Sequence, residues 1–159
     1  MLELGSFVRQ DHDDLHYMLR VLGDATTADT PVAELLERVR TRFEAHTEAE
    51  TMTLGAMLEQ SRPPPTLYFL VSQVIAAHLA QEAALAQLLR QQLGTTGFRD
   101  RARYLRQLVA HHGEHEAACL HPALTDHLPR EIYRTLATSY TVERDRRLAF
   151  LERAIARSA

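Results

Sequence analysis

The 159-residue chain has no lysine, one cysteine and only six glycines. Because lysine is absent, all 18 basic residues are arginine, and 21 acidic residues leave a net charge of −3 with the histidines neutral. A weakly acidic chain without a basic stripe gives no electrostatic reason to expect nucleic acid as a partner. With 45% hydrophobic residues and so little glycine, the composition also argues against a disordered or fibrous protein.

A single cysteine, Cys119, cannot form an internal disulfide, and this favours a reducing compartment. The N-terminal sequence MLELGSFVRQDHDD turns acidic too early for a signal peptide. No apolar run approaches the roughly 20 residues that a membrane-spanning helix needs. We therefore expect a cytoplasmic protein that has no membrane partner.

Strand signals are weak, because alternating apolar and polar runs are short and no Asn-Gly or Asp-Gly hairpin turn occurs. Apolar residues instead recur with helical spacing in five segments. Thr30, as an N-cap residue followed by Pro31, starts the second of them, and three prolines from Pro63 onward end it. The five predicted helices span about 6–22, 30–62, 66–93, 98–122 and 129–157, with an irregular stretch between the fourth and the fifth.

The length of the chain suits a single domain covering residues 1–159. Short connections between four long helices imply that neighbouring helices are antiparallel. We therefore predict an all-α fold. It is an up-down-up-down four-helix bundle over about residues 6–128, with an additional C-terminal helix over about residues 129–157.

Each of the four bundle helices places one histidine in the middle of its apolar face, when side chains are set about 100° apart around the helix axis. Two of these helices add a glutamate one turn after the histidine. An ionised glutamate in a bundle core is costly unless a cation compensates it, and no arginine is placed to do so. A metal centre would supply the missing positive charge. The six candidate ligands are His12, His46, Glu50, His78, His112 and Glu116.

These residues follow an internal repeat with an offset of 66 positions. His12 corresponds to His78, the pair His46 and Glu50 corresponds to His112 and Glu116, and the apolar residues follow at the same offset. Each half must bury its apolar face against the other, which gives an approximate two-fold arrangement. Such symmetry favours a two-metal site near the axis, to which each half gives two imidazoles and one carboxylate.

Several polar residues lie near the six without sharing their central position. His16 and Glu82, each one turn beyond a central histidine, are predicted to face inward, where they could orient a ligand imidazole or ligate. His115 lies about 60° off the centre of its helix face, where it could play the same part. Cys119 is placed on the core face one turn after Glu116, as a structural thiol or as a redox group beside the metal. Tyr17, Tyr104 and Tyr140 could also hydrogen-bond near the centre, but no pattern places any of them there.

The distribution of the six ligands resembles the hemerythrin-like (HHE cation-binding) family. The segments HTEAETMTLGAML and HGEHEAACLHPAL are similar to its two repeated metal-binding helices, and the resemblance covers roughly residues 6–128. It implies a non-haem centre of two iron ions, held by histidine nitrogens and bridged by the two glutamates. Histidine and carboxylate ligands also suit manganese or zinc, so the ligand types alone do not select the metal.

The chain departs from the oxygen-carrying hemerythrins in the second half of the pattern. Those proteins have His-x3-His on the third helix and His-x4-Asp on the fourth, where this chain has His78-x3-Glu82 and His112-x3-Glu116. The version with six ligands and two glutamates is more similar to the repair-of-iron-centres proteins. Fewer imidazoles leave open coordination positions, which favours reaction with small oxidants over reversible oxygen carriage.

The first functional hypothesis is a di-iron protein that reacts with O2, peroxide or NO in redox or stress response or iron handling, with peroxidase-, catalase- or oxidase-like activity. A second is a metal-dependent sensing or binding module without turnover. A third is a di-iron oxygenase or oxidase that acts on a specific organic substrate. The C-terminal helix could serve as a partner surface, as the contact of a homodimer, or as a simple cap on the bundle.

Overall fold

The structure, a computed structural model, describes residues 3–158, and within that range it contains helices and no strand. The prediction of an all-α protein is therefore confirmed. The elements are α1 (Leu4–Asp24), α2 (Thr30–Ser61), α3 (Pro65–Leu89), α4 (Thr96–His115), the π-helix η1 (Glu116–Leu120), α5 (His121–His127) and α6 (Arg130–Ser158).

The start of α2 corrects one prediction. Asp29, not Thr30, is the N-cap residue, because its extended backbone lets the carboxylate accept a hydrogen bond of 3.2 Å from the Val32 amide. Pro31 then lies in the first turn, where its missing N–H has no partner to lose. Helix α4 starts in the same way, since the Thr95 hydroxyl accepts from the Phe98 amide at 3.2 Å.

Helix α3 ends at Leu89, four residues before the predicted end. The connection to α4 passes through Gly94, whose φ of 73° lies in the left-handed region that favours glycine. A Cβ atom at this position would lie 2.8 Å from the Thr27 carbonyl oxygen. The α3–α4 turn therefore packs closely on the α1–α2 loop and needs a residue without a side chain.

The chain stays helical beyond Pro122, where we expected an irregular stretch. A proline removes one backbone donor and collides with the carbonyl four residues before it. The π-helix η1 widens the turn just ahead of this proline, so that the His121 N–H reaches the Glu116 carbonyl, five residues back. Because a wider turn also rotates the residues that follow, Cys119 is exposed and Leu120 is buried. The prediction that Cys119 lies on the core face is wrong.

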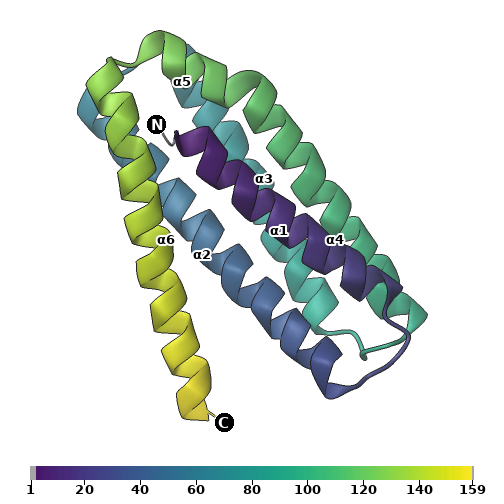
Figure 1. Cartoon of the computed structure of the whole chain (residues 1–159). Helices are drawn as coiled ribbons and strands as arrows, with labels where there is room; N and C mark the ends of the chain where they lie inside the picture. The colour runs from purple at the N-terminus through teal and green to yellow at the C-terminus, as the bar shows by residue number, and fades with distance from the viewer. Residues whose placement is uncertain (1–2, 159) are drawn as a thin grey trace.

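Helices α1 to α4 lie alongside one another and α6 runs along the outside of α2 (Figure 1). The contacts join α1 with α2, α2 with α3, α3 with α4, and α4 with α1, so the four helices surround a common interior. Helix α6 packs against α2 and α1. It is thus joined to the bundle over two of its helices.

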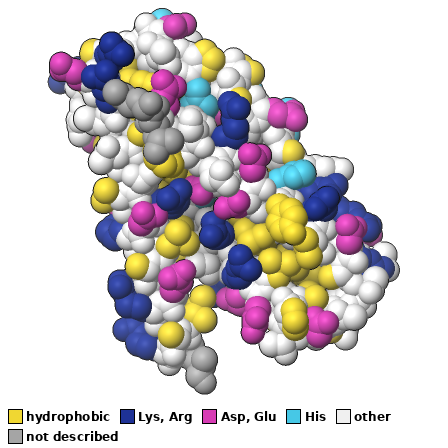
Figure 2. All heavy atoms as spheres, viewed as in Figure 1, with side chains coloured by type: hydrophobic (Ala, Val, Ile, Leu, Met, Phe, Trp, Pro, Cys, Tyr) yellow, Lys and Arg dark blue, Asp and Glu magenta, His cyan; other side chains and the backbone are white. Residues whose placement is uncertain are grey.

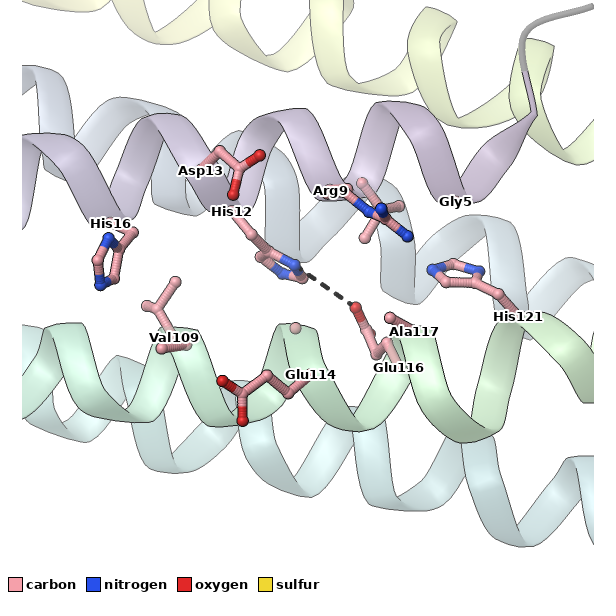
Figure 3. A pocket seen from close by; sticks show the side chains of 13 residues that line it. Gly5, Arg9, His12, Asp13, His16, Val109, Glu114, Glu116, Ala117 and His121 are labelled. Atoms are coloured by element: carbon pink, nitrogen blue, oxygen red, sulfur yellow. Dashed lines mark ion pairs between the residues drawn. The ribbon is translucent and has the colours of Figure 1, made fainter.

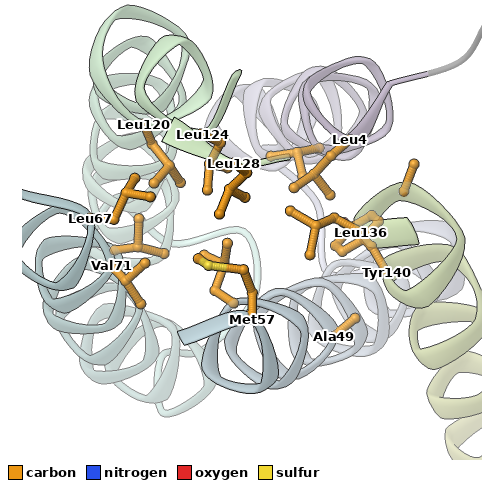
Figure 4. Close-up of a cluster of buried hydrophobic side chains, with 14 residues drawn as sticks. Leu4, Ala49, Met57, Leu67, Val71, Leu120, Leu124, Leu128, Leu136 and Tyr140 are labelled. Carbon is orange, nitrogen blue, oxygen red and sulfur yellow. The ribbon is translucent and has the colours of Figure 1, made fainter. Parts of the chain in front are cut away.

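The interior holds two separate apolar clusters. One gathers side chains such as Leu4, Met57, Leu67, Leu120 and Tyr140, and is shown in Figure 4. The other is formed mainly by leucines of α1 and α3 with phenylalanines of α2 and α4. Burying one such side chain stabilises the fold by about 1.5–3 kcal/mol.

On each of helices α1 to α4, the predicted ligand histidine lies between a residue of one apolar cluster and a residue of the other. On α1, for example, His12 lies between Val8 and Leu15, and on α4 His112 lies between Val109 and Leu120. The six candidate ligands therefore form a polar layer between two apolar layers. This arrangement shields the layer from water above and below.

Helix α3 corrects the expectation that no segment of the chain is long and apolar enough to span a membrane. Within the described residues it is the one helix long and apolar enough to cross a membrane by length and composition, and about 33% of the relevant window is buried. It nevertheless contacts α2 and α4 and brings His78 into the interior. Figure 2 shows acidic and basic side chains interspersed over one face of the molecule, with an apolar patch beside them.

Candidate metal centre

The structure brings all six candidate ligands into one buried group. None of them is more than 7% exposed, and both glutamates are fully buried. They come from five helical elements and from both halves of the repeat: His12 from α1, His46 and Glu50 from α2, His78 from α3, His112 from the end of α4, and Glu116 from the start of η1.

The four imidazoles point their Nε2 atoms at one another in pairs. Nε2 of His12 lies 3.0 Å from Nε2 of His46, and Nε2 of His78 lies 3.1 Å from Nε2 of His112. Two ligand atoms that each lie about 2.1 Å from one ion, at right angles to each other, are about 3.0 Å apart. Both pairs therefore have the separation of two nitrogens that share a metal ion, and the 66-residue repeat relates one pair to the other.

The carboxylates of Glu50 and Glu116 have no hydrogen-bond donor among the described residues, although all four oxygens are buried. Imidazole nitrogens lie close to them: Glu50 Oε2 is 3.4 Å from His78 Nε2, and Glu116 Oε1 is 3.1 Å from His112 Nε2. A buried carboxylate without donors is costly, and a cation between the carboxylates and the imidazoles would satisfy all of these atoms. The donor set therefore fits a metal ion.

The ligand atoms fall into two groups of four, each within a span of 4.8 Å. One group is His12, His46, Glu50 and His112, and the other is Glu50, His78, His112 and Glu116. Each group holds the three residues of one half of the repeat, and Glu50 and His112 belong to both. Each group could hold a metal ion, and of the two residues in both groups only the carboxylate of Glu50 has two oxygens to offer.

Burial keeps the histidines in the form that binds metals. It lowers the pKa of His12 to about 4 and that of His112 to about 3, and it lowers the pKa of His46 well below its ordinary value. These imidazoles are therefore neutral near pH 7, with a nitrogen lone pair free for a cation.

The two carboxyl groups differ. Burial alone would raise the pKa of Glu50, but the imidazoles of His78 and His46 outweigh it and lower that pKa. Burial raises the pKa of Glu116 well above its ordinary range, and the negative charge of Glu50 raises it further. Two carboxylates in one buried site resist ionising together unless positive charge joins them.

Acid is expected to destabilise the metal-free protein through His12. An unfolded histidine has a pKa of about 6.5, whereas burial lowers the pKa of His12 to about 4 in the folded protein. Between these pH values the unfolded state binds a proton that the folded state does not. This contribution to stability is therefore lost as the pH falls from about 6.5 to about 4, by up to ~1.4 kcal/mol per pH unit.

The raised pKa of Glu116 changes the folding stability with pH in the opposite direction. The contribution of His12 is therefore measured by comparing a variant with the wild type. Urea unfolding of the metal-free protein at pH 7 and pH 5 should show a loss that is about 1–2 kcal/mol smaller in His12→Gln than in the wild type. His127→Gln, at an exposed position, is the control and should lose as much as the wild type. Equal losses in all three proteins would contradict the prediction.

The site contains three residues that the sequence did not place there, namely Asp11, Tyr140 and Arg144. Tyr140 of α6 is fully buried, its hydroxyl lies 2.7 Å from Nδ1 of His46, and it donates a hydrogen bond to the carboxylate of Asp11. Arg144 binds both oxygens of Asp11 at 3.2 Å. Asp11 and Tyr140 are 129 positions apart and lie outside the repeat, so no spacing rule connects them.

A cavity of about 310 Å³ lies between α1 and the segment from α4 to α5, and it reaches the buried group (Figure 3). Its lining includes His12 and Glu116, whose Nδ1 and Oε2 atoms are 3.8 Å apart. Arg9 and His121 lie toward one end of the cavity and His16 toward the other. Small molecules therefore have a way to one side of the site.

Gly113 sets the distance between α4 and the His12 ring. A Cβ atom at this position would lie 2.8 Å from Nδ1 of His12. The corresponding residue in the first half of the repeat is Thr47. A glycine is therefore needed on this side of the site, where α1 and α4 approach each other and the imidazole fills the space.

The three additional candidates take less central places. His16 and Glu82 are exposed, so the expectation that both face the interior is wrong, although His16 lines the cavity beside His12. Their angles from the central histidines put them at the edge of the apolar faces, and the helices do not close over that edge. His115 is half-buried. Burial is the main cause of the lowered pKa of His112, and the nearby His115 makes a smaller contribution in the same direction.

No protein-family model matches the chain, and neither a curated protein nor a solved structure matches it.

Proposed function

We propose that this protein is a hemerythrin-like di-iron protein that reacts with a small oxidant such as O2, hydrogen peroxide or NO. In this proposal α1 to α4 form an up-down-up-down bundle, and the two groups of ligands hold one iron ion each. The observation that carries it is the buried layer of four imidazoles and two carboxylates, whose atoms are spaced as ligands and whose carboxylate oxygens have no hydrogen-bond partner among the described residues.

Two iron ions would supply one-electron and two-electron redox chemistry toward such oxidants. The chain's own residues supply the rest. The apolar layers exclude bulk water, the carboxylate of Glu50 lies where its two oxygens can serve both metal positions, and Tyr140 holds the His46 ring. Manganese and zinc suit the same donor set, so the metal is decided by analysis of the purified protein.

The size of the cavity supports a small oxidant over a larger organic substrate. Pockets that take organic ligands are roughly 300–1,000 Å³, and a volume of about 310 Å³ lies at the lower end of that range. Arg9, Asp13 and Glu114 are among the ionisable residues of its lining. A diatomic gas or peroxide needs far less space than this volume.

The deciding experiment is metal analysis of freshly purified protein, followed by anaerobic iron loading and exposure to each oxidant in turn. We expect two irons per chain, an optical change on exposure to peroxide or O2, and faster consumption of peroxide than by free iron. A protein that holds no transition metal after anaerobic loading would refute the proposal.

Two other outcomes would separate the alternatives. Stoichiometric iron with an optical response but no turnover would favour a sensing module, in which the oxidation state alters the packing of the bundle. Turnover that starts only when an organic reductant or co-substrate is added would favour an oxygenase or oxidase. Both outcomes retain the metal centre and overturn the assignment of oxidant consumption.

A further inference from the structure

Tyr140 connects the C-terminal helix to a ligand of the candidate metal centre. Its hydroxyl has one proton, and that proton is donated to the carboxylate of Asp11. Arg144 lies 3.2 Å from both oxygens of this carboxylate, so that Asp11 accepts hydrogen bonds from Arg144 as well as from Tyr140. The direction of the Tyr140–Asp11 bond is therefore fixed.

The direction of the next bond follows from the first. Nδ1 of His46 lies 2.7 Å from the Tyr140 oxygen, which has already donated its proton and can only accept. Nδ1 of His46 must consequently carry the ring proton. In a neutral imidazole this leaves Nε2 unprotonated, and Nε2 is the atom that faces His12 and the centre of the site.

We infer that Tyr140 is a positioning residue: with Asp11 behind it, it fixes His46 in the tautomer that presents a lone pair to the metal, and so makes α6 part of the metal centre. The tautomer does not depend on whether a metal is bound. The consequence for metal affinity rests on the proposed function.

The repeat shows that this support is particular to one histidine. His112, the counterpart of His46, contacts His78 and Glu116 through its Nε2 atom. The other histidine of the second half, His78, has a long contact through Nδ1, which lies 3.4 Å from the Thr51 hydroxyl. The first half of the repeat therefore has a rigidly oriented ligand that the second half lacks.

Helix α6 is held firmly enough to act as this support. Arg147 pairs with Glu44 at 2.6 Å and with Glu48 at 2.7 Å, both on α2, two residues before and two residues after His46. Leu136 and Ala137, one turn before Tyr140, are buried in the apolar cluster at the same end. The tyrosine is thus fixed both along α6 and against α2.

The test replaces Tyr140 by phenylalanine, which keeps the packed ring and removes only the hydroxyl. Tyr133→Phe is the matched control, because Tyr133 lies on the same helix, is half-buried and packs against the same cluster. Nitrogen-15 NMR of the metal-free protein should show His46 protonated at Nδ1 in the wild type and in Tyr133→Phe. In Tyr140→Phe the ring should shift to a mixture or to the Nε2-protonated form.

Iron(II) titration gives the second measurement. Loss of a group that orients a ligand histidine typically lowers metal affinity by roughly 10–100-fold. We expect a loss of iron affinity in that range for Tyr140→Phe and no loss for Tyr133→Phe. If Tyr140→Phe does not fold, Asp11→Asn replaces it, because the amide lets Tyr140 turn its proton toward His46 and should give the Nε2-protonated form.

The outcomes are distinct. An Nδ1-protonated His46 in both the wild type and Tyr140→Phe, with equal iron affinity, would overturn the inference. A tautomer change in a protein that binds no iron at all would support the role of Tyr140 in setting the ring, while the di-iron function itself would fall.

Discussion

Glu50→Gln is expected to weaken iron binding by at least ~100-fold and to prevent the protein from holding two ions. Glu50 is the carboxylate common to both ligand groups, and its oxygens have no other described partner. Glutamine has nearly the same shape but no negative charge, so it cannot offset the positive charge of two metal ions. The measurement is the iron content after dialysis, together with a titration under anaerobic conditions.

The matched control is Glu59→Gln, an exposed glutamate on the same helix, which should bind iron like the wild type. The metal-free Glu50→Gln protein should still fold, because glutamine keeps the shape of the side chain and the two apolar clusters on either side of the layer are unchanged. Loss of binding with intact folding would therefore identify Glu50 as a ligand. Two tightly bound irons in Glu50→Gln would contradict the assignment.

Iron loading is expected to raise the melting temperature of the wild type by about 10 °C or more. A ligand at about 1,000 times its dissociation constant stabilises the folded state by about 4 kcal/mol, and for a domain of this size each kcal/mol shifts the midpoint by roughly 2–4 °C. The ion also relieves the burial of two carboxylates without donors. The measurement is thermal unfolding with and without iron(II), under anaerobic conditions.

Calcium provides the control, because it takes six to eight oxygen ligands and the site offers mostly imidazole nitrogen. Calcium should leave the melting temperature unchanged, and a chelator should reverse the effect of iron. The gain should be largely absent in Glu50→Gln. An equal rise with calcium would indicate binding to surface carboxylates instead of the buried site.

The sequence was sufficient to predict the helices and the grouping of the six buried residues for a physical reason. Both depend on regular helical geometry, in which the spacing along the chain determines the face that a side chain occupies. His46 and Glu50 are one turn apart on α2, so their common direction follows from the sequence alone. The 66-residue repeat then relates this pair to His112 and Glu116.

The errors lie where that geometry changes or where tertiary packing decides. Cys119 was placed on the core face by counting α-helical turns, and the π-helix rotates it outward. The role of Tyr140 depends on how α6 docks against α1 and α2, which no local pattern specifies. Exposure of His16 and Glu82 likewise depends on how closely neighbouring helices approach at the edge of each face.

Gly113 and the cavity beside it make the two sides of the duplicated site unequal in their access to solvent. His12 and Glu116 line the cavity, whereas their repeat counterparts His78 and Glu50 are not part of its lining. Two half-sites that are equivalent in sequence thus differ in what can reach them. A molecule entering between α1 and α4 meets a ligand from each half at once, and it meets them from one side only.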